Sequence, residues 1–529
     1  MNGMEFVSAR YRLRCAPADA DTIARQIALE QSVEVPEELV RSAAIRDEVI
    51  GQVRRVEPCA SQPGSFIADI DYPADLAGVH VGQMWNLLYG NISLKRKIRL
   101  EQVTLPRSVR QHLSGPRYGV DGVREMLGVF GRPLLATALK PRGSSPEQLA
   151  GLAAAFAAGG GDLVKDDHNL VDASFAGFCE RVDRCQNAVN ETNSRTGRRT
   201  LYAPNLSPPI QELDRYAEYL VRRGFRAALI APMLLGLDTV AQLTRRYPLV
   251  WLAHPTFTGS FFQDPDHGVA PELLLGQWFR WLGCDATVFP NHGGRFSFSR
   301  EECLAIATSA RNPDADFAPC WPAPAGGMSF ERLREMGAEY GPDTQFLIGG
   351  ALLGDSADLE TSTRRYRAAI AECFPQATHR PAQEEWVSAC ELPVPKTALA
   401  ILEHLRFHPD FSWHGRPATA YKPDDRLPFR DVSRTELIGA FGESTAFDLR
   451  YFEIAPGGYS SREKHVHAHV VIGVRGQGTL VSGESVQPIA PWDVAYVPSL
   501  RAHQLRNDGS EPFGFLCIVD HERDRPQPA

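Results

Sequence analysis

Short apolar runs that end in polar residues or glycine recur through the middle of the chain, and a stretch with helical spacing follows each one. The eight runs lie at 134–140, 162–165, 201–204, 227–232, 249–254, 286–290, 318–322 and 346–350. Continuously apolar strands that alternate with helices are typical of a parallel (β/α)8 TIM barrel, in which both faces of each strand are buried. The pattern therefore predicts an α/β barrel over residues 118–378, with a doubly wound open sheet as the alternative.

Two pairs of glycines favour the barrel over the open sheet. Gly326-Gly327 follows the seventh run and Gly349-Gly350 ends the eighth. Phosphate-binding barrels present backbone N–H groups at these two strands. The glycines could simply make tight turns, but two pairs at these two strands indicate a phosphorylated substrate.

The flanking regions have different patterns. Residues 1–117 mix strand-like segments at 64–73 and 97–105 with a helical stretch at 19–29, which predicts a small α+β domain of the ferredoxin-like kind. A Pro-rich linker is expected at 379–417, with prolines gathered at 392–395 and 408–417. Residues 418–529 alternate between polar and apolar positions and contain many turns, which predicts an all-β module.

Composition narrows the class of protein without indicating an activity. The 529 residues are 43% hydrophobic and 23% charged, as in folded globular proteins, and the net charge of −8 argues against a nucleic-acid partner. The chain has no apolar run long enough for a membrane span, and residues 1–15 contain no apolar core segment, so neither a membrane helix nor a secretory signal is expected. The ten cysteines form no C-x-x-C pair, which favours a reducing, cytoplasmic location.

Chemically useful side chains cluster where the predicted barrel strands end, which is where barrel enzymes place their active sites. They are Lys140, Arg142, the segment 165–168, Asn205, His254 and the segment 291–295. Asp167 and His168 could bind a divalent cation, but a lysine such as Lys165 is a poor ligand for Mg²⁺, which prefers oxygen. The residues alone leave open an exposed helix N-terminus at 165–168, capped by Asp166 or Asp167.

The segments Leu-Leu-Ala-Thr-Ala-Leu-Lys-Pro-Arg (134–142) and Gly-Gly-Asp-Leu-Val-Lys-Asp-Asp-His (160–168) resemble the first two barrel strands of the RuBisCO large-chain superfamily. The likeness extends over residues 1–373. It implies that CO2 carbamylates Lys165 and so supplies oxygen ligands, that Lys165, Asp167 and His168 bind Mg²⁺, and that Lys140 transfers protons.

The resemblance also assigns further residues. His254 matches the family's histidine after the fifth strand, and residues 325–327 and Gly349-Gly350 match its phosphate loops. Glu30 and Asn91 match residues that enter a partner subunit's site, which implies a homodimer. The remaining predicted substrate contacts are Arg142, Asn291, Gly294 and Arg295.

Departures from carboxylating RuBisCO argue against carbon fixation. His168 stands in place of a glutamate ligand and Pro255 in place of a phosphate-binding arginine, while Arg142 replaces a lysine and Ala325 a serine. The segment 289–299 is shorter than the loop whose lysine grips the carboxylated intermediate. The chain is therefore similar to RuBisCO-like proteins, which share only the enolising half of the reaction.

Among RuBisCO-like proteins, the Lys-Asp-Asp-His and Asn-x-Gly-Gly-Arg-Phe-Ser patterns resemble the type that isomerises 5-methylthioribulose 1-phosphate to 1-methylthioxylulose 5-phosphate in methionine salvage. The alternatives are a diketomethylthiopentyl phosphate enolase and a decarboxylase of oxidised sugar-acid phosphates. Each would act on a phosphorylated sugar or a close derivative.

The last region carries His465, His467 and His469 at alternate positions, followed by an apolar run. On a strand, all three imidazoles would face the same side, and such a group suits Mn, Fe, Ni, Cu or Zn. A solvated edge strand is the alternative. With a further segment at 493–507 that contains His503, this region resembles the two cupin motifs, although Leu500 replaces a motif glycine and His469 a glutamate.

The cupin resemblance implies a metal site among His465, His467, His469 and His503, with Glu463 in the place of the first motif histidine. Cupins include enzymes and sensors, so the fold alone does not give a reaction. Fusion to this barrel suggests a cupin that removes the methylthio group from the barrel's product, with glutathione as co-substrate. The alternative is a cupin that serves as a non-catalytic sensor or stability module.

Overall fold

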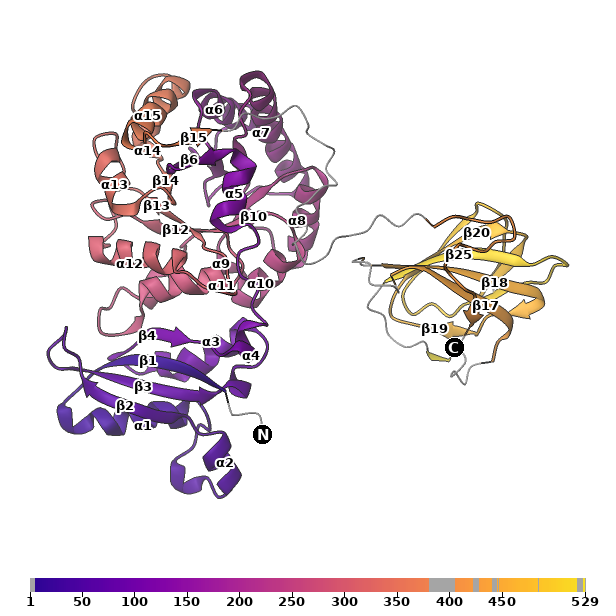
Figure 1. Ribbon diagram of the computed structural model, residues 1–529, viewed down its shortest axis with the longest axis horizontal. Coiled ribbons are helices and arrows are strands. Elements are labelled where there is room, and N and C mark those ends of the chain that lie inside the picture. The colour runs from indigo at the N-terminus through magenta and orange to yellow at the C-terminus, as the bar shows by residue number, and fades with distance from the viewer. Residues whose placement is uncertain are drawn as a thin grey trace. The chain divides into compact units, whose positions relative to one another are not determined.

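The computed structural model describes residues 5–379, 405–421, 428–439, 445, 447–483, 485–520 and 527–528 (Figure 1). It divides into two compact units, Met1–Ala389 and Cys390–Ala529. The predicted linker segment at 392–395 lies outside the described residues. Within the described part, no helix has both the length and the apolar character that a membrane span requires.

The first unit begins with an antiparallel sheet in the order β4-β1-β3-β2. Its strands are β1 (Phe6–Arg14), β2 (Gln52–Pro58), β3 (Ser65–Pro73) and β4 (Ile98–Thr104), and its main helices are α1 (Ala20–Glu30) and α3 (Val81–Tyr89). Strand β1 alternates between buried and partly buried residues, so one face of the sheet packs on the helices. The βαββαβ order confirms the ferredoxin-like prediction, although β1 and β2 had not been recognised in the sequence.

Eight parallel strands form the barrel, in the order β8-β7-β6-β14-β13-β12-β10-β9. A bridge between Asn205 and Leu229 joins β8 to β9 and closes the ring. The strands are β6 (Leu134–Leu139), β7 (Leu163–Asp166), β8 (Leu201–Ala203), β9 (Ala227–Ile230), β10 (Val250–Ala253), β12 (Ala286–Pro290), β13 (Trp321–Ala325) and β14 (Gln345–Leu347). The TIM-barrel prediction is thus confirmed.

Helices separate the barrel strands and surround the ring (Figure 1). They are α6 (Pro146–Gly159), α7 (Phe175–Thr196), α8 (Leu213–Arg222), α9 (Pro232–Leu235), α10 (Leu237–Arg246), the π-helix η7 (Glu272–Trp278) with α11 (Phe279–Trp281), α12 (Arg300–Arg311), α13 (Leu333–Tyr340), α14 (Gly350–Leu353) and α15 (Leu359–Cys373). After β10, the two-residue strand β11 (Gly268–Val269) pairs with β4, so this loop is also part of the N-terminal sheet.

The seventh barrel strand was placed too early in the sequence. It was predicted at 318–322 but occupies Trp321–Ala325. The backbone carbonyls just before it are engaged elsewhere: Ala318 accepts a hydrogen bond from Arg280, and Pro319 accepts one from the N–H of Val120. Apolar residues at 317–320 therefore pack outside the sheet, and the apolar pattern could not show where pairing begins.

A short helix closes the end of the barrel opposite the predicted site. Helix α5 (Gly119–Leu127) buries Val120, Val123 and Leu127 against barrel-interior residues of the strands, including Leu134 and Trp321. The carboxylate of Asp285, at the start of β12, accepts the N–H groups of Tyr118 and Gly119 and fixes the start of this helix. The apolar plug leaves the carboxyl ends of the strands as the open end.

The second unit is an antiparallel β-barrel, as expected for a cupin. The main sheet follows the order β22-β21-β24-β18-β25-β20-β23, with β17 on β18 and β16 on β17. Its strands are β16 (Thr419–Ala420), β17 (Arg430–Ile438), β18 (Phe447–Tyr459), β20 (His469–Arg475), β21 (Gly478–Ser482), β22 (Ser485–Ile489), β23 (Val494–Val497), β24 (Gln504–Arg506) and β25 (Phe513–Asp520), while β19 (Glu463–Lys464) pairs with β26 (Gln527–Pro528). Aromatic and aliphatic side chains such as Phe452, Ile454 and Phe515 fill the interior.

A buried ion pair holds the beginnings of β6 and β7 together. Asp162 accepts two hydrogen bonds from Arg132, at 2.7 and 2.9 Å, and a third from the N–H of Leu135 at 2.7 Å. The side chains of Arg132 and Asp162 are only 7% and 6% exposed. Removing one partner of such a pair leaves an uncompensated buried charge.

We expect Asp162→Ala to lower the free energy of unfolding of the barrel by about 3–5 kcal/mol. Urea denaturation monitored by tryptophan fluorescence measures this loss. The control is Glu180→Ala, which breaks the exposed Arg184–Glu180 pair on α7 and should change stability by no more than about 0.5 kcal/mol. Equal effects of the two substitutions would contradict the role assigned to the Arg132–Asp162 pair.

Candidate functional site

A cavity of about 1360 Å³ opens at the carboxyl ends of the barrel strands. It brings together most of the predicted site residues: Lys140, Lys165, Asp167, His168, His254, Arg295, Gly326, Gly327, Gly349 and Gly350. These residues follow five different strands and the loop after a sixth. The convergence agrees with the rule that barrel enzymes build their sites at this end.

The end of β7 divides its side chains between two environments, because successive residues of a strand point to opposite faces. Lys165 and Asp167 line the cavity. Asp166 points the other way and is completely buried, where it accepts hydrogen bonds from Arg181, from the Tyr202 hydroxyl at 2.8 Å and from the N–H of Asn205 at 2.8 Å. The alternative of an exposed helix N-terminus at 165–168 is therefore excluded.

Lys140 and Asp167 form the central ion pair of the cavity, with Nζ and Oδ2 2.9 Å apart. The hydrogen bonds from Lys140 and from the N–H of Asn169 outweigh the effect of burial and lower the pKa of Asp167. The other carboxylate oxygen lies 3.3 Å from Nδ1 of His168. Asp167 thus stays ionised between a cationic amine and an imidazole.

Lys165 is 3% exposed, and its Nζ donates to the backbone oxygen of Asp166 at 2.9 Å. Burial, assisted by the nearby Lys140 charge, lowers the pKa of Lys165 to about 8. A lysine amine reacts with CO2 in its neutral form, and the resulting carbamate is an oxygen donor. With that donor, the Asp167 carboxylate and the His168 imidazole, the residues present fit a divalent cation.

His254 lies beside His168, with the two rings stacked at a centroid distance of 4.2 Å. Burial, together with the Lys165 and His168 charges, lowers the pKa of His254 to about 2, so its ring is neutral. Its Nδ1 accepts the N–H of Thr256 at 3.2 Å and lies 2.6 Å from the Thr256 hydroxyl. Since Nδ1 is an acceptor, the proton resides on Nε2, and His254 is a hydrogen-bond donor at that atom.

The glycine loops provide backbone groups without side chains. Gly326 and Gly327, directly after β13, have φ angles of 78° and 63°, in the left-handed region that favours glycine. The Arg332 guanidinium donates to the carbonyls of Gly327 at 2.6 Å and His292 at 3.0 Å, and so ties this loop to the loop after β12. Gly349 and Gly350 line the cavity from the end of β14.

Three predicted substrate contacts are placed elsewhere. The side chain of Asn291 is buried against α13, where it accepts the Tyr340 hydroxyl at 2.6 Å and donates to Met336 Sδ. Arg142 is exposed, and Gly294 packs against Gly327. None of these three residues is among the described residues that line the cavity.

Glu30 and Asn91, predicted to enter a partner's site, lie together on the N-terminal domain. Asn91 Nδ2 donates to Glu30 Oε1 and to Glu34 Oε1, both at 3.0 Å. Neither Glu30 nor Asn91 is among the described residues that line this chain's own cavity. The structure thus brings the two residues together, while their entry into a partner's site stays a prediction.

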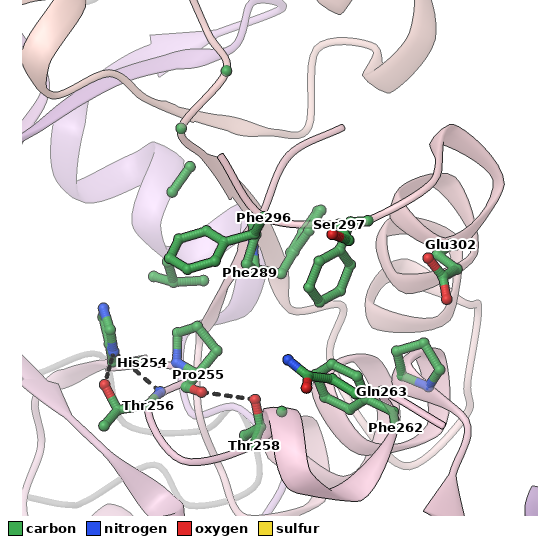
Figure 2. A pocket seen from close by; sticks show the side chains of 18 of the residues that line it. His254, Pro255, Thr256, Thr258, Phe262, Gln263, Phe289, Phe296, Ser297 and Glu302 are labelled. Carbon is green, nitrogen blue, oxygen red and sulfur yellow. Dashed lines mark hydrogen bonds between the residues drawn. The ribbon is translucent and has the colours of Figure 1, made fainter. Parts of the chain in front are cut away.

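Aromatic rings line both sides of one part of the barrel cavity, here called the aromatic wall, which the motif analysis did not anticipate. Phe289 and Phe296 lie across the cavity from Pro255 and Phe262 (Figure 2). Phe298 adds a fourth aromatic ring, packed edge-on against Phe262 at 5.5 Å. These residues come from β12 and from the loops after β10 and β12. A cluster of phenylalanines at the strand ends is the sequence signal that could have revealed this wall.

The cupin encloses a smaller cavity of about 180 Å³. Ligand atoms of His465, His469 and His503 lie within 4.8 Å of one another beside it. His465 Nδ1 lies 2.6 Å from the His467 carbonyl and His503 Nδ1 lies 3.0 Å from the Arg501 carbonyl, so both carry their proton on Nδ1. His469 Nδ1 lies 3.3 Å from Cys517 Sγ, and its Nε2 is buried without a hydrogen-bond partner.

Three imidazoles gathered in this way fit a transition-metal ion, for which imidazole is a common ligand. Burial and the neighbouring histidines lower the pKa of His469 to about 2, so it is neutral as a ligand must be. Glu463 also lines this cavity and accepts the Ser461 hydroxyl at 2.6 Å.

The predicted single strand of three histidines is wrong. Strand β19 ends at Lys464 and β20 begins at His469, so only His469 lies in a strand. His467 stacks on the ring of His465 at 3.7 Å and lies outside the three-histidine cluster. Leu500, which replaces the motif glycine, has a left-handed φ of 60° and donates its N–H to the carbonyl of His465.

Comparison with known families supports the identification of the barrel and of the cupin. Residues 119–295 match the model of the ribulose bisphosphate carboxylase large chain, catalytic domain, and residues 450–519 match the cupin domain. The chain is 38% identical over 372 residues to ribulose bisphosphate carboxylase-like protein 1 of Rhodopseudomonas palustris, covering 70% of this chain and 99% of that protein. Both matches agree with the resemblances found in the sequence.

A second relative has an activity in its name. The chain is 38% identical over 367 residues to the 5-methylthioribulose-1-phosphate isomerase of Rhodospirillum rubrum, covering 69% of this chain and 96% of that protein. Among solved structures, the Rubisco-like protein of Rhodopseudomonas palustris superposes with a TM-score of 0.63 at 37% identity, covering 69% of this chain and 98% of that one. These matches span about the length of the first unit.

We expect His503→Ala to weaken transition-metal binding by the cupin at least about 100-fold, because it removes one of three ligand atoms. Metal content after dialysis against a weak chelator, measured by mass spectrometry, reports the loss. The matched control is His467→Ala, which lies outside the cluster and should retain the metal. Equal metal loss in both variants would show that the ligand set includes His467.

Proposed function

The chain belongs to the RuBisCO-like proteins of the ribulose bisphosphate carboxylase large-chain family, with a cupin domain after the barrel, and on that premise we propose that the barrel isomerises 5-methylthioribulose 1-phosphate to 1-methylthioxylulose 5-phosphate. The observation that carries the proposal is the two-sided cavity. It has glycine loops for one phosphate and an aromatic wall for an apolar group.

The aromatic wall distinguishes this substrate from a bisphosphate. Pro255 stands where carboxylating relatives have a phosphate-binding arginine, and it faces Phe289 and Phe296 (Figure 2). A second phosphate would lose part of its hydration against these rings, which is unfavourable. A methylthio group is apolar and makes favourable contacts with aromatic rings.

The chain's own residues provide the proton chemistry. Lys140 holds a mobile proton at Nζ, 2.9 Å from the Asp167 carboxylate, and lines the same cavity as the donor Nε2 of His254. An oxygen on the substrate can accept a hydrogen bond from the His254 Nε2–H, while Lys140 in its amine form takes a proton from the neighbouring carbon and returns it at another carbon. Bound Mg²⁺, held by carbamylated Lys165, Asp167 and His168, would supply positive charge that stabilises the enediolate.

The proposal includes a homodimer. Glu30 and Asn91 are paired with each other and lie away from the described residues of their own barrel cavity, which suits a role in a partner's site. The proposed location is the cytoplasm, in keeping with the free thiols of the nine cysteines that the structure describes.

For the cupin, the proposed second activity is removal of the methylthio group from the barrel product, with glutathione as co-substrate. The cavity of 180 Å³ is smaller than the roughly 300–1,000 Å³ of common ligand sites. Glutathione could therefore place only its thiol end inside. The same observation also suits the alternative of a sensor for a small ligand.

We expect turnover of 5-methylthioribulose 1-phosphate in D2O, with Mg²⁺ and bicarbonate, to incorporate solvent deuterium into a methylthiopentulose phosphate. NMR of the product mixture detects the deuterium and identifies the product. No deuterium in any pentulose would reject the isomerase. Product from the diketomethylthiopentyl phosphate or from an oxidised sugar-acid phosphate alone would favour the enolase or the decarboxylase.

Lys165→Ala should abolish Mg²⁺-dependent turnover, because the carbamate ligand cannot form. The control is Lys97→Ala in the N-terminal domain, which lies outside the described lining of the cavity and should retain full activity. Circular dichroism checks that both variants are folded. Full activity of Lys165→Ala would refute the carbamate assignment.

Activation by CO2 should depend on pH through Lys165. Its folded-state pKa of about 8 lies below the usual 10.4, so the neutral amine increases as pH rises toward 8 and is nearly complete above 9. We expect the activation rate, at constant dissolved CO2, to rise about tenfold from pH 6 to 7 and to level off above pH 8. A rate that keeps rising tenfold per pH unit up to pH 10 would show an unperturbed lysine.

A further inference from the structure

The cupin cavity contains a charged side chain that the metal site does not use. Arg450, on β18, lines this cavity together with His465, His469 and His503. Its Nε is buried and has no hydrogen-bond partner within the described part of the chain. Within those same residues, its Nη2 donates one hydrogen bond, a long one of 3.7 Å to Cys517 Sγ. The guanidinium of Arg450 therefore lies against the cavity with most of its N–H groups not hydrogen-bonded to the described residues.

The other charges at the cavity are largely balanced. The second lining arginine, Arg434, is paired in charge with Glu436, whose carboxylate lies 3.0 Å from its Nε, although that Nε, like the one of Arg450, makes no hydrogen bond within the described residues. Glu463 is the lining carboxylate, and its Oε2 accepts the Ser461 hydroxyl. Tyr421 hydrogen-bonds to Ser461 through its hydroxyl. With a divalent ion held by the three histidines, the cavity would have a net positive charge beside the Arg450 guanidinium.

Cys517 connects Arg450 to the histidine cluster. Its Sγ lies 3.3 Å from His469 Nδ1 and 3.7 Å from Arg450 Nη2, so one side chain contacts both groups. Phe452, whose ring centroid lies 5.3 Å from the guanidinium carbon, and Phe515 provide apolar walls. Hydrogen bonds to a charged group are stronger in such surroundings than in water.

We propose that Arg450 anchors the carboxylate of a small anionic ligand whose other donor atom meets the ion at His465, His469 and His503. A planar guanidinium matches a carboxylate with two parallel hydrogen bonds. The volume of 180 Å³ corresponds to about six waters, so the enclosed part of the ligand has only a few heavy atoms. The inference rests on the proposed cupin metal site and is independent of the barrel reaction.

The test uses the full chain loaded with Co²⁺, whose visible absorption responds to its ligands, and oxalate as the probe. The spectrum of the His503→Ala variant is subtracted, so that the cupin ion alone is observed. We expect oxalate to change the wild-type spectrum in a saturable way. Arg450→Gln should weaken oxalate binding at least about tenfold, or about 1.4 kcal/mol. The cobalt spectrum recorded before oxalate is added should be the same as that of the wild type.

The matched control is Arg506→Gln, on β24, an exposed arginine outside the described lining of this cavity, which should bind oxalate as the wild type does. Oxalate affinity of Arg450→Gln within twofold of the wild type would overturn the proposal. So would a response to inorganic phosphate and none to oxalate.

Failure of the cupin metal site can be distinguished from failure of the ligand proposal. A cobalt spectrum that His503→Ala does not alter rejects the cupin metal site and the ligand proposal with it. An intact cupin cobalt spectrum that oxalate leaves unchanged rejects the ligand proposal alone.

Discussion

The barrel site depends on how Asp166 is buried at the end of β7. Its carboxylate is surrounded by Arg181, the Tyr202 hydroxyl and the N–H of Asn205, so it cannot rotate toward the cavity. Because side chains alternate along a strand, this contact orients Lys165 and Asp167 toward the cavity on either side. A non-ligand residue thereby fixes the two groups from which a cation site would be built.

Much of this arrangement could be predicted from the sequence because it follows from strand geometry. Strands buried on both faces leave continuous apolar runs, and the polar residues after those runs must meet at one end of a barrel. Side-chain direction in the loops was harder to predict. Asn291 follows β12 as a ligand-binding residue would, yet Tyr340 and Met336 of α13 hold its side chain, and no local pattern links these residues.

In the cupin, too, the positions of the site residues could be predicted only in part from the sequence. The three alternating histidines suggested one strand, but the chain leaves β19 after Lys464 and enters β20 at His469. The metal-binding atoms converge because Nδ1 of each histidine has a contact: the carbonyls of His467 and Arg501, and Cys517 Sγ. Arg450 and Cys517 lie on β18 and β25, far apart in sequence and outside either motif, so only the folded barrel brings them together.

The two candidate centres use different chemical designs. The barrel gathers neighbouring residues of one strand, and in our proposal a carbamylated lysine would complete an oxygen-rich site for a hard cation. The cupin gathers neutral imidazoles from separate segments and suits a softer ion. With both proposed sites filled, one chain would combine two metal chemistries that select different ions from the same solution.

The apolar plug formed by α5 determines at which end of the barrel substrate and product can enter and leave. Val120, Val123 and Leu127 fill the end of the barrel opposite the cavity, and Asp285 holds the helix start in place. Within the described residues, substrate and product would therefore enter and leave at the same end of the barrel, through the cavity at the carboxyl ends of the strands. Each product must depart before the next substrate enters, and in the proposed sequence of reactions the cupin could receive the barrel product only after it has left through this opening.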